Sequence, residues 1–207
     1  MPLVAVLDYG IGNLHSAQKA LEKVGADARL TADPGLVREA AGVVLPGVGN
    51  FGRCIEALER TGLDELAIEC AGSGRPFLGV CIGMQMLYQG SEESPDLPGL
   101  GVLPGIVRRL PDGVKRPQMQ WNVLVRRGPS GLLTGLPDPT WAYFVHSFAA
   151  DRDDHAVAVC DYGGPVVAAV ERDALWATQF HPEKSGRSGL AILANFVRAA
   201  ADRAEAA

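Results

Sequence analysis

Residues 77–87 read FLGVCIGMQML, with Cys81 near the middle of the segment. The apolar run that ends at Val80 predicts a buried strand, and the apolar residues after Gly83 are compatible with a helix. A glycine lies two residues to either side of Cys81, which is the spacing of a nucleophile elbow with cysteine in place of serine. Such a tight turn lifts one side chain out of the sheet and requires very small neighbours. The segment therefore predicts a strand, a sharp turn at Cys81 and a helix.

A helix that begins directly after Cys81 would affect the chemistry of its sulfur. It would direct free backbone N–H groups and the positive end of its dipole toward the sulfur. Both favour the thiolate, which is the nucleophilic form of cysteine. The alternative is a buried structural cysteine between two packing glycines, and the glycine spacing alone does not separate the two interpretations. A base elsewhere in the chain would favour the nucleophile.

Residues 179–183 read QFHPE and supply that base. Because Pro182 disfavours a helical conformation at His181, we expect an extended segment in which His181 and Glu183 face the same side. The carboxylate would then orient the imidazole, and the imidazole would take the thiol proton of Cys81. A lone histidine at a strand end is more often a polar rim residue, but this one has two partners of the required types. Such a context is absent from the sequence around the other histidines, His15, His146 and His155.

Attack on a carbonyl also requires hydrogen-bond donors for the developing oxyanion. Residues 46–49 read PGVG and follow an apolar run, so their N–H groups could approach a substrate closely. The N–H of Ile82 is the second candidate. The alternative for residues 46–49 is an ordinary β–α turn. Taken with Cys81, His181 and Glu183, these donors indicate acyl transfer through a thioester.

The first ninety residues alternate apolar runs with segments of helical periodicity, which predicts a parallel sheet with right-handed crossovers. The apolar runs are residues 3–7, 26–30, 42–45 and 76–80. Ligand sites in such sheets form at the carboxyl ends of the strands, where Cys81 and residues 46–52 would lie. Later β-rich runs predict largely antiparallel additions to this sheet or a small flanking sheet: 106–110, 122–126, 141–148, 156–160, 166–170 and 175–180. We expect a closing helix from about Gly186 and a single α/β domain over residues 1–207.

Composition excludes several classes of protein. The chain has 207 residues, 47% of them hydrophobic and 21% charged, which is typical of a folded soluble protein. A net charge of −5 without a basic stripe argues against nucleic-acid binding. The four cysteines show neither Cys-x-x-Cys spacing nor clustering with histidine, which argues against a zinc site and a disulfide framework. With no signal-peptide pattern and no apolar run near the ~20 residues of a membrane span, we expect a cytoplasmic protein without metal or cofactor.

Three segments together, PGVG, LGVCIGMQ and QFHPE, resemble the class I (triad) glutamine amidotransferases. The resemblance implies a flavodoxin-like fold, with a central, mostly parallel sheet flanked by helices and antiparallel strands added in the second half. Other segments resemble one branch of this family, the glutaminase subunits of a two-subunit synthase of histidine biosynthesis. These segments are residues 8–14, 46–51, 143–147 and 180–185. The likeness covers essentially the whole chain.

The resemblance implies that Cys81 attacks the side-chain amide of L-glutamine and that His181, oriented by Glu183, transfers the protons. Ammonia would pass to a partner cyclase with a (β/α)8 barrel fold, with which the chain would form a heterodimer. The resemblance assigns oxyanion and glutamine binding to Val48, Gly49, Ile82, Gln85, Ser147 and Phe148. It assigns the partner interface or gating to Trp121, Asn122, Tyr143 and Lys184.

One segment departs from the family pattern. The family usually carries PHMGWN beside the active site, whereas residues 117–122 here read PQMQWN. Gln120 replaces a glycine, so it would be strained if that glycine had a positive φ. We expect the change to affect docking and activation rather than the chemistry of Cys81.

Three other functions are compatible with parts of the sequence. They are a glutaminase subunit of another ammonia-dependent synthase, a free hydrolase of γ-glutamyl compounds, and a non-catalytic regulatory module on the same fold. Residues 143–147 and 182–185 argue against the first. Co-purification with a cyclase would exclude the second. The presence of Cys81, His181 and Glu183 argues against the third.

Overall fold

A computed structural model describes residues 1–150 and 153–206 of the chain. Within these residues the main sheet has nine strands in the order β2-β1-β3-β4-β12-β11-β10-β7-β8. The first five in this order are mutually parallel, which is the flavodoxin-like arrangement that the sequence predicts. They are β1 (Leu3–Leu7), β2 (Asp27–Thr31), β3 (Gly42–Gly47), β4 (Phe77–Cys81) and β12 (Leu175–Thr178).

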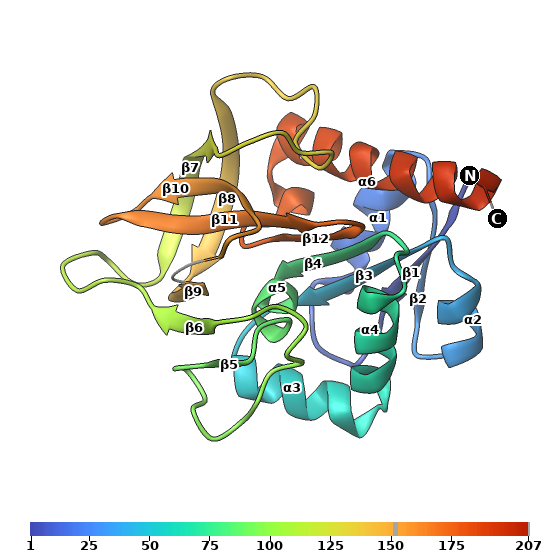
Figure 1. The fold of residues 1–207 in the computed structure, drawn as a ribbon, viewed down its shortest axis with the longest axis horizontal. Helices are drawn as coiled ribbons and strands as arrows, with labels where there is room; N and C mark the ends of the chain where they lie inside the picture. Colours follow the sequence, from blue (N-terminus) through green and yellow to red (C-terminus); the bar gives the residue numbers. More distant parts are fainter. Residues whose placement is uncertain (151–152, 207) are drawn as a thin grey trace.

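Helices cover both faces of the parallel half (Figure 1). In this view α1 and α6 lie above the sheet and α3 and α4 lie below it. The closing helix begins at Gly186, as predicted, and buries an apolar stripe that includes Ile192 and Phe196. The helices are α1 (Leu14–Lys23), α2 (Pro34–Glu39), α3 (Phe51–Arg60), α4 (Leu63–Gly72), α5 (Ile82–Met86) and α6 (Gly186–Ala206).

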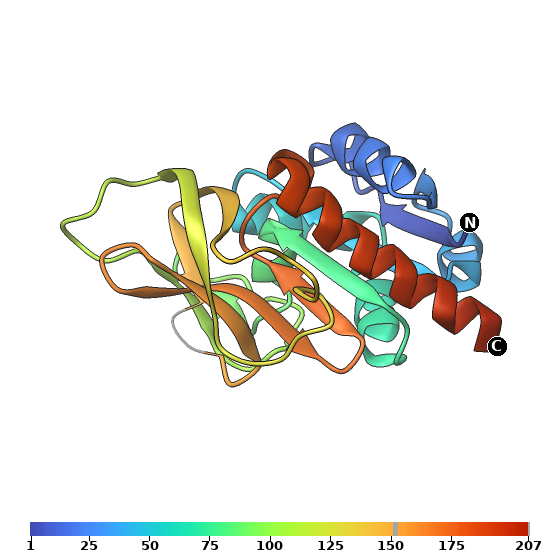
Figure 2. The ribbon, with the colours of Figure 1, turned by 90° about the horizontal axis from the view of Figure 1, so that it is seen from above.

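The second half of the chain extends the main sheet with antiparallel strands and adds a small flanking sheet, so both predicted arrangements occur (Figure 2). The antiparallel strands are β7 (Gln118–Arg126), β8 (Thr140–His146), β10 (Ala156–Asp161) and β11 (Pro165–Arg172). The flanking sheet contains β5 (Gly90–Ser91), β6 (Ile106–Arg109) and β9 (Phe148–Ala150).

Three predicted strands differ in detail from the structure. The run predicted at 122–126 begins four residues earlier, at Gln118. The run 175–180 forms β12, which pairs in parallel with β4 and antiparallel with β11, so it joins the two halves of the sheet. The run 141–148 is interrupted at Ser147. The residues before Ser147 form β8 of the main sheet, and those after it form β9 of the flanking sheet. This corner places Ser147 and Phe148 in the lining of the cavity described below.

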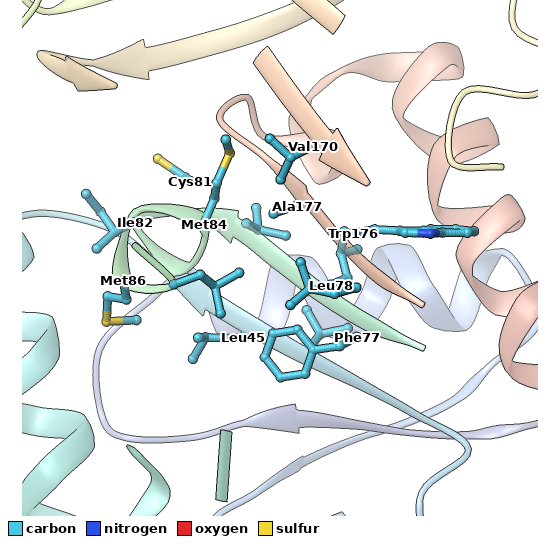
Figure 3. Packing of buried hydrophobic residues seen from close by; sticks show 14 of the residues in the cluster. Leu45, Phe77, Leu78, Cys81, Ile82, Met84, Met86, Val170, Trp176 and Ala177 are labelled. Atoms are coloured by element: carbon cyan, nitrogen blue, oxygen red, sulfur yellow. The ribbon is translucent and has the colours of Figure 1, made fainter. Parts of the chain in front are cut away.

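The elbow at Cys81 is as tight as the glycine spacing predicts. Cys81 has φ of 56° and ψ of −111°, outside the conformations that a side chain usually adopts. A Cβ atom at Gly83 would lie 1.8 Å from the carbonyl oxygen of Leu45, so glycine alone permits α5 to pack on β3. Figure 3 shows Cys81 and Ile82 at this turn, with Leu45, Phe77 and Leu78 packed in the apolar interior.

Replacing Gly83 by alanine is expected to destabilise the protein by about 3 kcal/mol or more, because the new methyl group meets backbone that cannot move aside. Urea unfolding would measure the change. Gly72 in α4 is the matched control, since a Cβ there meets no atom within 4 Å. Gly72→Ala should change the free energy of unfolding by less than about 1 kcal/mol, in the stabilising direction. Equal stability of the two variants would contradict the close approach at Gly83.

Two features sought at the sequence level are not found in the described residues. No helix combines the length and apolar character that crossing a membrane requires. Residues 1–150 and 153–206 also contain no group of three or more His, Cys, Asp or Glu side chains arranged to hold a metal ion.

Candidate active site

A cavity of about 260 Å³ lies beside the elbow, at the carboxyl end of β4. Most of the residues that the sequence assigns to chemistry or glutamine binding line it. They are Val48, Gly49, Cys81, Ile82, Gln85, Ser147, Phe148 and His181. Lys184, assigned to the interface, also lines the cavity, and so do Glu93 and His146, which the sequence analysis did not assign.

Cys81, His181 and Glu183 converge as the sequence predicts. The Nδ1 atom of His181 lies 2.8 Å from Oε1 of Glu183, and both side chains are at most 5% exposed. The Cys81 side chain lines the same cavity as the imidazole and interacts with it strongly enough to raise its pKa. The predicted reason for this convergence is partly wrong, because only His181 is extended. Glu183 lies in the 3₁₀ turn η1 (Pro182–Lys184), which folds its carboxylate back onto the ring.

The electrostatics of His181 follow from this geometry. Burial lowers the pKa of the imidazole, but hydrogen bonds to the Cys81 sulfur and the Glu183 carboxylate outweigh burial and raise the pKa to about 9. The ring is therefore an imidazolium at neutral pH. A cationic ring in the cavity can give a proton to a leaving group, which the departure of an amide nitrogen requires.

The raised pKa of His181 predicts a specific pH dependence. Because the folded pKa of about 9 exceeds the ordinary 6.5, protonated His181 stabilises the fold fully below pH 6.5. This contribution is lost as the pH rises through 9. In Cys81→Ala the pKa should fall, because the largest favourable interaction is removed. Titration of the ¹⁵N-labelled imidazole by NMR would measure both values, and an unchanged pKa in the variant would contradict the assignment.

The loop after β3 is held by two buried side chains that the sequence analysis did not assign. The Tyr9 hydroxyl donates to the carbonyl oxygen of Pro46 at 2.6 Å, and the Cys54 thiol donates to that of Val48 at 3.4 Å. Burial raises the pKa of the Cys54 thiol to about 11, so this group remains a donor at neutral pH. Gly49 has φ of 95°, a conformation that favours glycine. These contacts fix where the candidate oxyanion donors of the loop lie.

Gln85 is the centre of a buried amide network. Its Nε2 donates to the carbonyl oxygen of Phe148 at 2.8 Å and to Oε1 of Gln179 at 3.0 Å. Gln179 in turn donates toward the Cys81 sulfur at 3.8 Å. Oε1 of Gln85 has no hydrogen-bond partner within the described part of the chain. Gln85 lines the cavity, but this oxygen is itself shielded from solvent, and a buried acceptor without a partner is costly. Gln179 was not assigned from the sequence, although it begins the QFHPE motif.

His146 corrects an expectation, since the sequence pattern indicated no partners for it. The structure buries it between the carbonyl oxygen of Phe148, 2.9 Å from Nδ1, and Oε1 of Gln118, 2.9 Å from Nε2. Burial lowers its pKa to about 4, so the ring is neutral. The register of β7 and β8 pairs Gln118 directly with His146. No local sequence pattern predicts this register, so the partner of His146 could not be identified from the sequence.

The expectation of strain at Gln120 is wrong. Residues 118–126 form the regular strand β7, and among the described non-glycine residues only Cys81 and Asp173 have positive φ. Gln118 is buried in this strand rather than in a loop, whereas Gln120 is exposed. The departure from the family pattern therefore lies in a strand, where a side chain at position 120 carries no backbone penalty.

The residues assigned to an interface are divided between two places. Trp121 and Tyr143 are paired across β7 and β8, with ring centroids 5.9 Å apart, and do not line the cavity. Asn122 donates from Nδ2 to the carbonyl oxygen of Asp161 at 2.9 Å, which holds the strands together. Lys184 lies at the cavity. Tyr143 also connects to the site, since its carbonyl oxygen accepts the N–H of His181 at 3.0 Å.

The sequence profile of the family described as glutamine amidotransferase class-I matches residues 5–200. The chain belongs to this family. The match confirms the predicted resemblance, and the sheet order described above agrees with the predicted fold.

Curated relatives place the chain in one branch of the class-I family. The three relatives that follow are each named imidazole glycerol phosphate synthase subunit HisH. The protein of Symbiobacterium thermophilum is 46% identical, over 98% of this chain and 96% of its own length. The protein of Methanothermobacter thermautotrophicus is 48% identical, over 94% of this chain and 98% of its own length. The protein of Deinococcus radiodurans is also 48% identical, over 95% of this chain and 94% of its own length. These identities confirm the predicted branch.

Solved structures support the fold alone, because their sequences are distant. A crystal structure titled glutamine amidotransferase has a TM-score of 0.75 at 21% identity and covers 96% of this chain and 98% of its own. The crystal structure of a putative GMP synthase subunit from Thermoplasma acidophilum has a TM-score of 0.74 at 20% identity. The match covers 100% of this chain and 97% of that one.

Proposed function

We propose that this class-I glutamine amidotransferase hydrolyses L-glutamine as the glutaminase subunit of an imidazole glycerol phosphate synthase and delivers the ammonia to a partner cyclase. The observation that carries the proposal is that Cys81 and His181 line one cavity while Glu183 holds His181 from behind, in a chain 46–48% identical to HisH subunits. A nucleophile, a base and an orienting carboxylate are the parts that amide hydrolysis through a thioester requires.

In the proposed mechanism, the Cys81 thiolate attacks the carboxamide carbon of glutamine. The oxyanion of the tetrahedral intermediate accepts hydrogen bonds from the N–H of Ile82 and from that of Val48 or Gly49. The imidazolium of His181 gives its proton to the amide nitrogen, the C–N bond breaks, and ammonia leaves with a glutamyl thioester remaining on Cys81.

His181 then acts as a base in the second half of the reaction. It takes a proton from water as the hydroxyl attacks the thioester carbon, and collapse of this intermediate releases glutamate and restores the thiolate beside an imidazolium. Glu183 keeps Nδ1 of His181 protonated, so that Nε2 exchanges the proton in both halves. The water supplies one hydrogen to the ammonia and its oxygen to glutamate.

The chemistry of the cavity suits glutamine. Gln85 and the Ser147–Phe148 segment line the cavity and would provide hydrogen bonds to the substrate. Glu93 and Lys184 add one carboxylate and one ammonium group to the lining, opposite in sign to the two ends of a zwitterionic amino acid. Glu93 is held by the N–H of Phe51 at 2.7 Å.

An exposed apolar face on β7 and β8 supports docking of a partner protein, and we propose that this partner is a cyclase with a (β/α)8 barrel, in a cytoplasmic heterodimer. Trp121 is 47% exposed and Met119 61% exposed, and the strand register places Trp141 on the same face. Large exposed apolar side chains grouped on one face are typical of interaction surfaces. Tyr143 belongs to this face, and its carbonyl oxygen accepts the N–H of His181. Docking on this face would therefore affect the position of His181.

The proposal is tested by measuring glutamate formation by the chain alone and with the cyclase subunit of the same organism loaded with its ribonucleotide ligand. Stimulation by the loaded cyclase, with one glutamate formed per cyclase product, is the expected result. Trp121→Asp should weaken the complex at least about tenfold, because a charge replaces an apolar contact. Rapid hydrolysis that the cyclase does not change would refute the synthase assignment and favour a free hydrolase.

A further inference from the structure

Gln118 and His146 form a buried pair that no step of the proposed mechanism uses. Gln118 is 0% exposed and His146 is 5% exposed, and the two face each other across β7 and β8. Beyond Gln118 lies the buried sulfur of Cys160, 3.9 Å from the Gln118 amide. On the other side, His146 contacts the carbonyl oxygen of Phe148. The pair thus connects the interior of the antiparallel strands to the wall of the cavity.

The number of protons on His146 decides how these groups are oriented. A carbonyl oxygen only accepts, so the contact with Phe148 requires the proton on Nδ1. Burial holds the pKa of the ring at about 4, so the ring carries one proton at neutral pH and Nε2 is an acceptor. Nε2 therefore requires a donor, and the partner within hydrogen-bond distance is the side-chain amide of Gln118.

Gln118 can supply this donor because its two amide ends exchange places on a half-turn of the terminal bond. With its NH₂ group toward His146, its oxygen faces Cys160. The Cys160 thiol is a donor, because burial raises its pKa to about 11. Each group then donates to the next: Cys160 to Gln118, Gln118 to His146, and His146 to the Phe148 carbonyl.

This series of hydrogen bonds, from Cys160 to the Phe148 carbonyl, is called the relay below. Its last acceptor, the Phe148 carbonyl, also determines the orientation of Gln85 in the glutamine site. The Phe148 carbonyl that accepts from His146 also accepts from Nε2 of Gln85 at 2.8 Å. Because Gln179 accepts the second proton of the same Nε2, the Gln85 amide cannot turn, and the side chain keeps its place in the cavity wall. A shift of the Phe148 peptide would release Gln85 from this place and weaken the binding of the substrate.

We propose that His146, kept in its neutral Nδ1-protonated form by Gln118, is a positioning residue for glutamine that acts through the Phe148 carbonyl and Gln85. This rests on the proposed function, since it deepens the description of the same site. It assigns a role to Gln118, and the role concerns substrate binding rather than docking of the partner.

The kinetic test compares two substitutions of His146 in the complex with the loaded cyclase. His146→Leu removes the donor and should raise KM for glutamine about tenfold while kcat changes less than about threefold. His146→Asn retains an N–H group near the position of Nδ1 and should restore most of the affinity. His155→Leu is the matched control, because His155 lies outside the cavity lining, and it should leave both constants unchanged.

The spectroscopic test uses ¹⁵N-histidine labelling of the same complex and does not depend on catalysis. Wild type should show His146 with its proton on Nδ1 at pH 7. Gln118→Glu replaces the donor by an acceptor, so the ring should take up a second proton and become an imidazolium. This variant retains the shape of the side chain and remains informative if His146→Leu unfolds.

The outcomes separate this inference from the proposed function. A wild-type complex that hydrolyses no glutamine would refute the proposed function and the positioning role together. Normal hydrolysis with an unchanged KM in His146→Leu, or equal effects of leucine and asparagine, would refute the positioning role alone. A proton on Nε2, or an imidazolium at pH 7 in the wild type, would refute the relay.

Discussion

Replacing Cys81 by alanine abolishes glutamine hydrolysis, with kcat falling by at least about 10³-fold in the complex with the loaded cyclase. The reason is chemical, since no other nucleophile occupies the elbow and the covalent route is lost. The fold should persist, because alanine fits the same buried position and introduces no new atom there. Glutamate formation in a coupled assay measures the activity, and thermal unfolding measures the stability.

Two controls make the Cys81→Ala result specific. Cys70→Ala removes a buried thiol in α4, outside the cavity lining, and should leave kcat unchanged. The Cys81→Ala complex should still make the cyclase product when ammonium salt is added, because the two half-reactions use different subunits. Glutamate formation by Cys81→Ala at more than about a tenth of the wild-type rate would contradict the role of the sulfur as nucleophile.

Replacing Glu183 by glutamine lowers kcat by about 10²- to 10⁴-fold, the second largest effect that we expect. Glutamine has nearly the same shape but no charge, and its NH₂ group can turn toward Nδ1 and favour the wrong tautomer of His181. The pKa of His181 should also fall, because the Glu183 carboxylate is among the groups that raise it to about 9. The pH–rate profile of the variant should shift accordingly.

Glu69 provides the matched control for Glu183. It forms an exposed ion pair with Arg38 at 2.9 Å, outside the cavity lining. Glu69→Gln should leave kcat and the pH profile unchanged and have little effect on stability, because exposed ion pairs contribute little. An undiminished kcat in Glu183→Gln, with the His181 pKa still near 9, would exclude an orienting role for the carboxylate.

Local patterns predict the elbow and the convergence of the triad well, because both depend on short segments. The glycines around Cys81 already require a tight turn, and His181 and Glu183 are only two residues apart. The predicted extended geometry is nevertheless wrong for Glu183. Pro182 restricts the residue before it but is compatible with the first position of a 3₁₀ turn, which brings the carboxylate onto the imidazole at 2.8 Å.

Long-range pairings could not be predicted in the same way. Gln118 meets His146 because of the register between β7 and β8, and Gln85 meets Phe148 because the chain changes sheets at Ser147. Neither register nor the change of sheet is encoded in a local pattern. The parallel pairing of β12 with β4 is a further example, since an apolar run does not specify the direction of its neighbours.

The central claim, that glutamine is hydrolysed through a thioester on Cys81, is tested most directly by trapping that intermediate. The complex with loaded cyclase would be mixed with glutamine, quenched in acid within milliseconds and digested for mass spectrometry. The account predicts a glutamyl adduct on the peptide that contains Cys81, which appears before steady state and is absent from Cys81→Ala. Glutamate formation without an adduct, or an adduct on Cys54 or Cys160 instead, would contradict it.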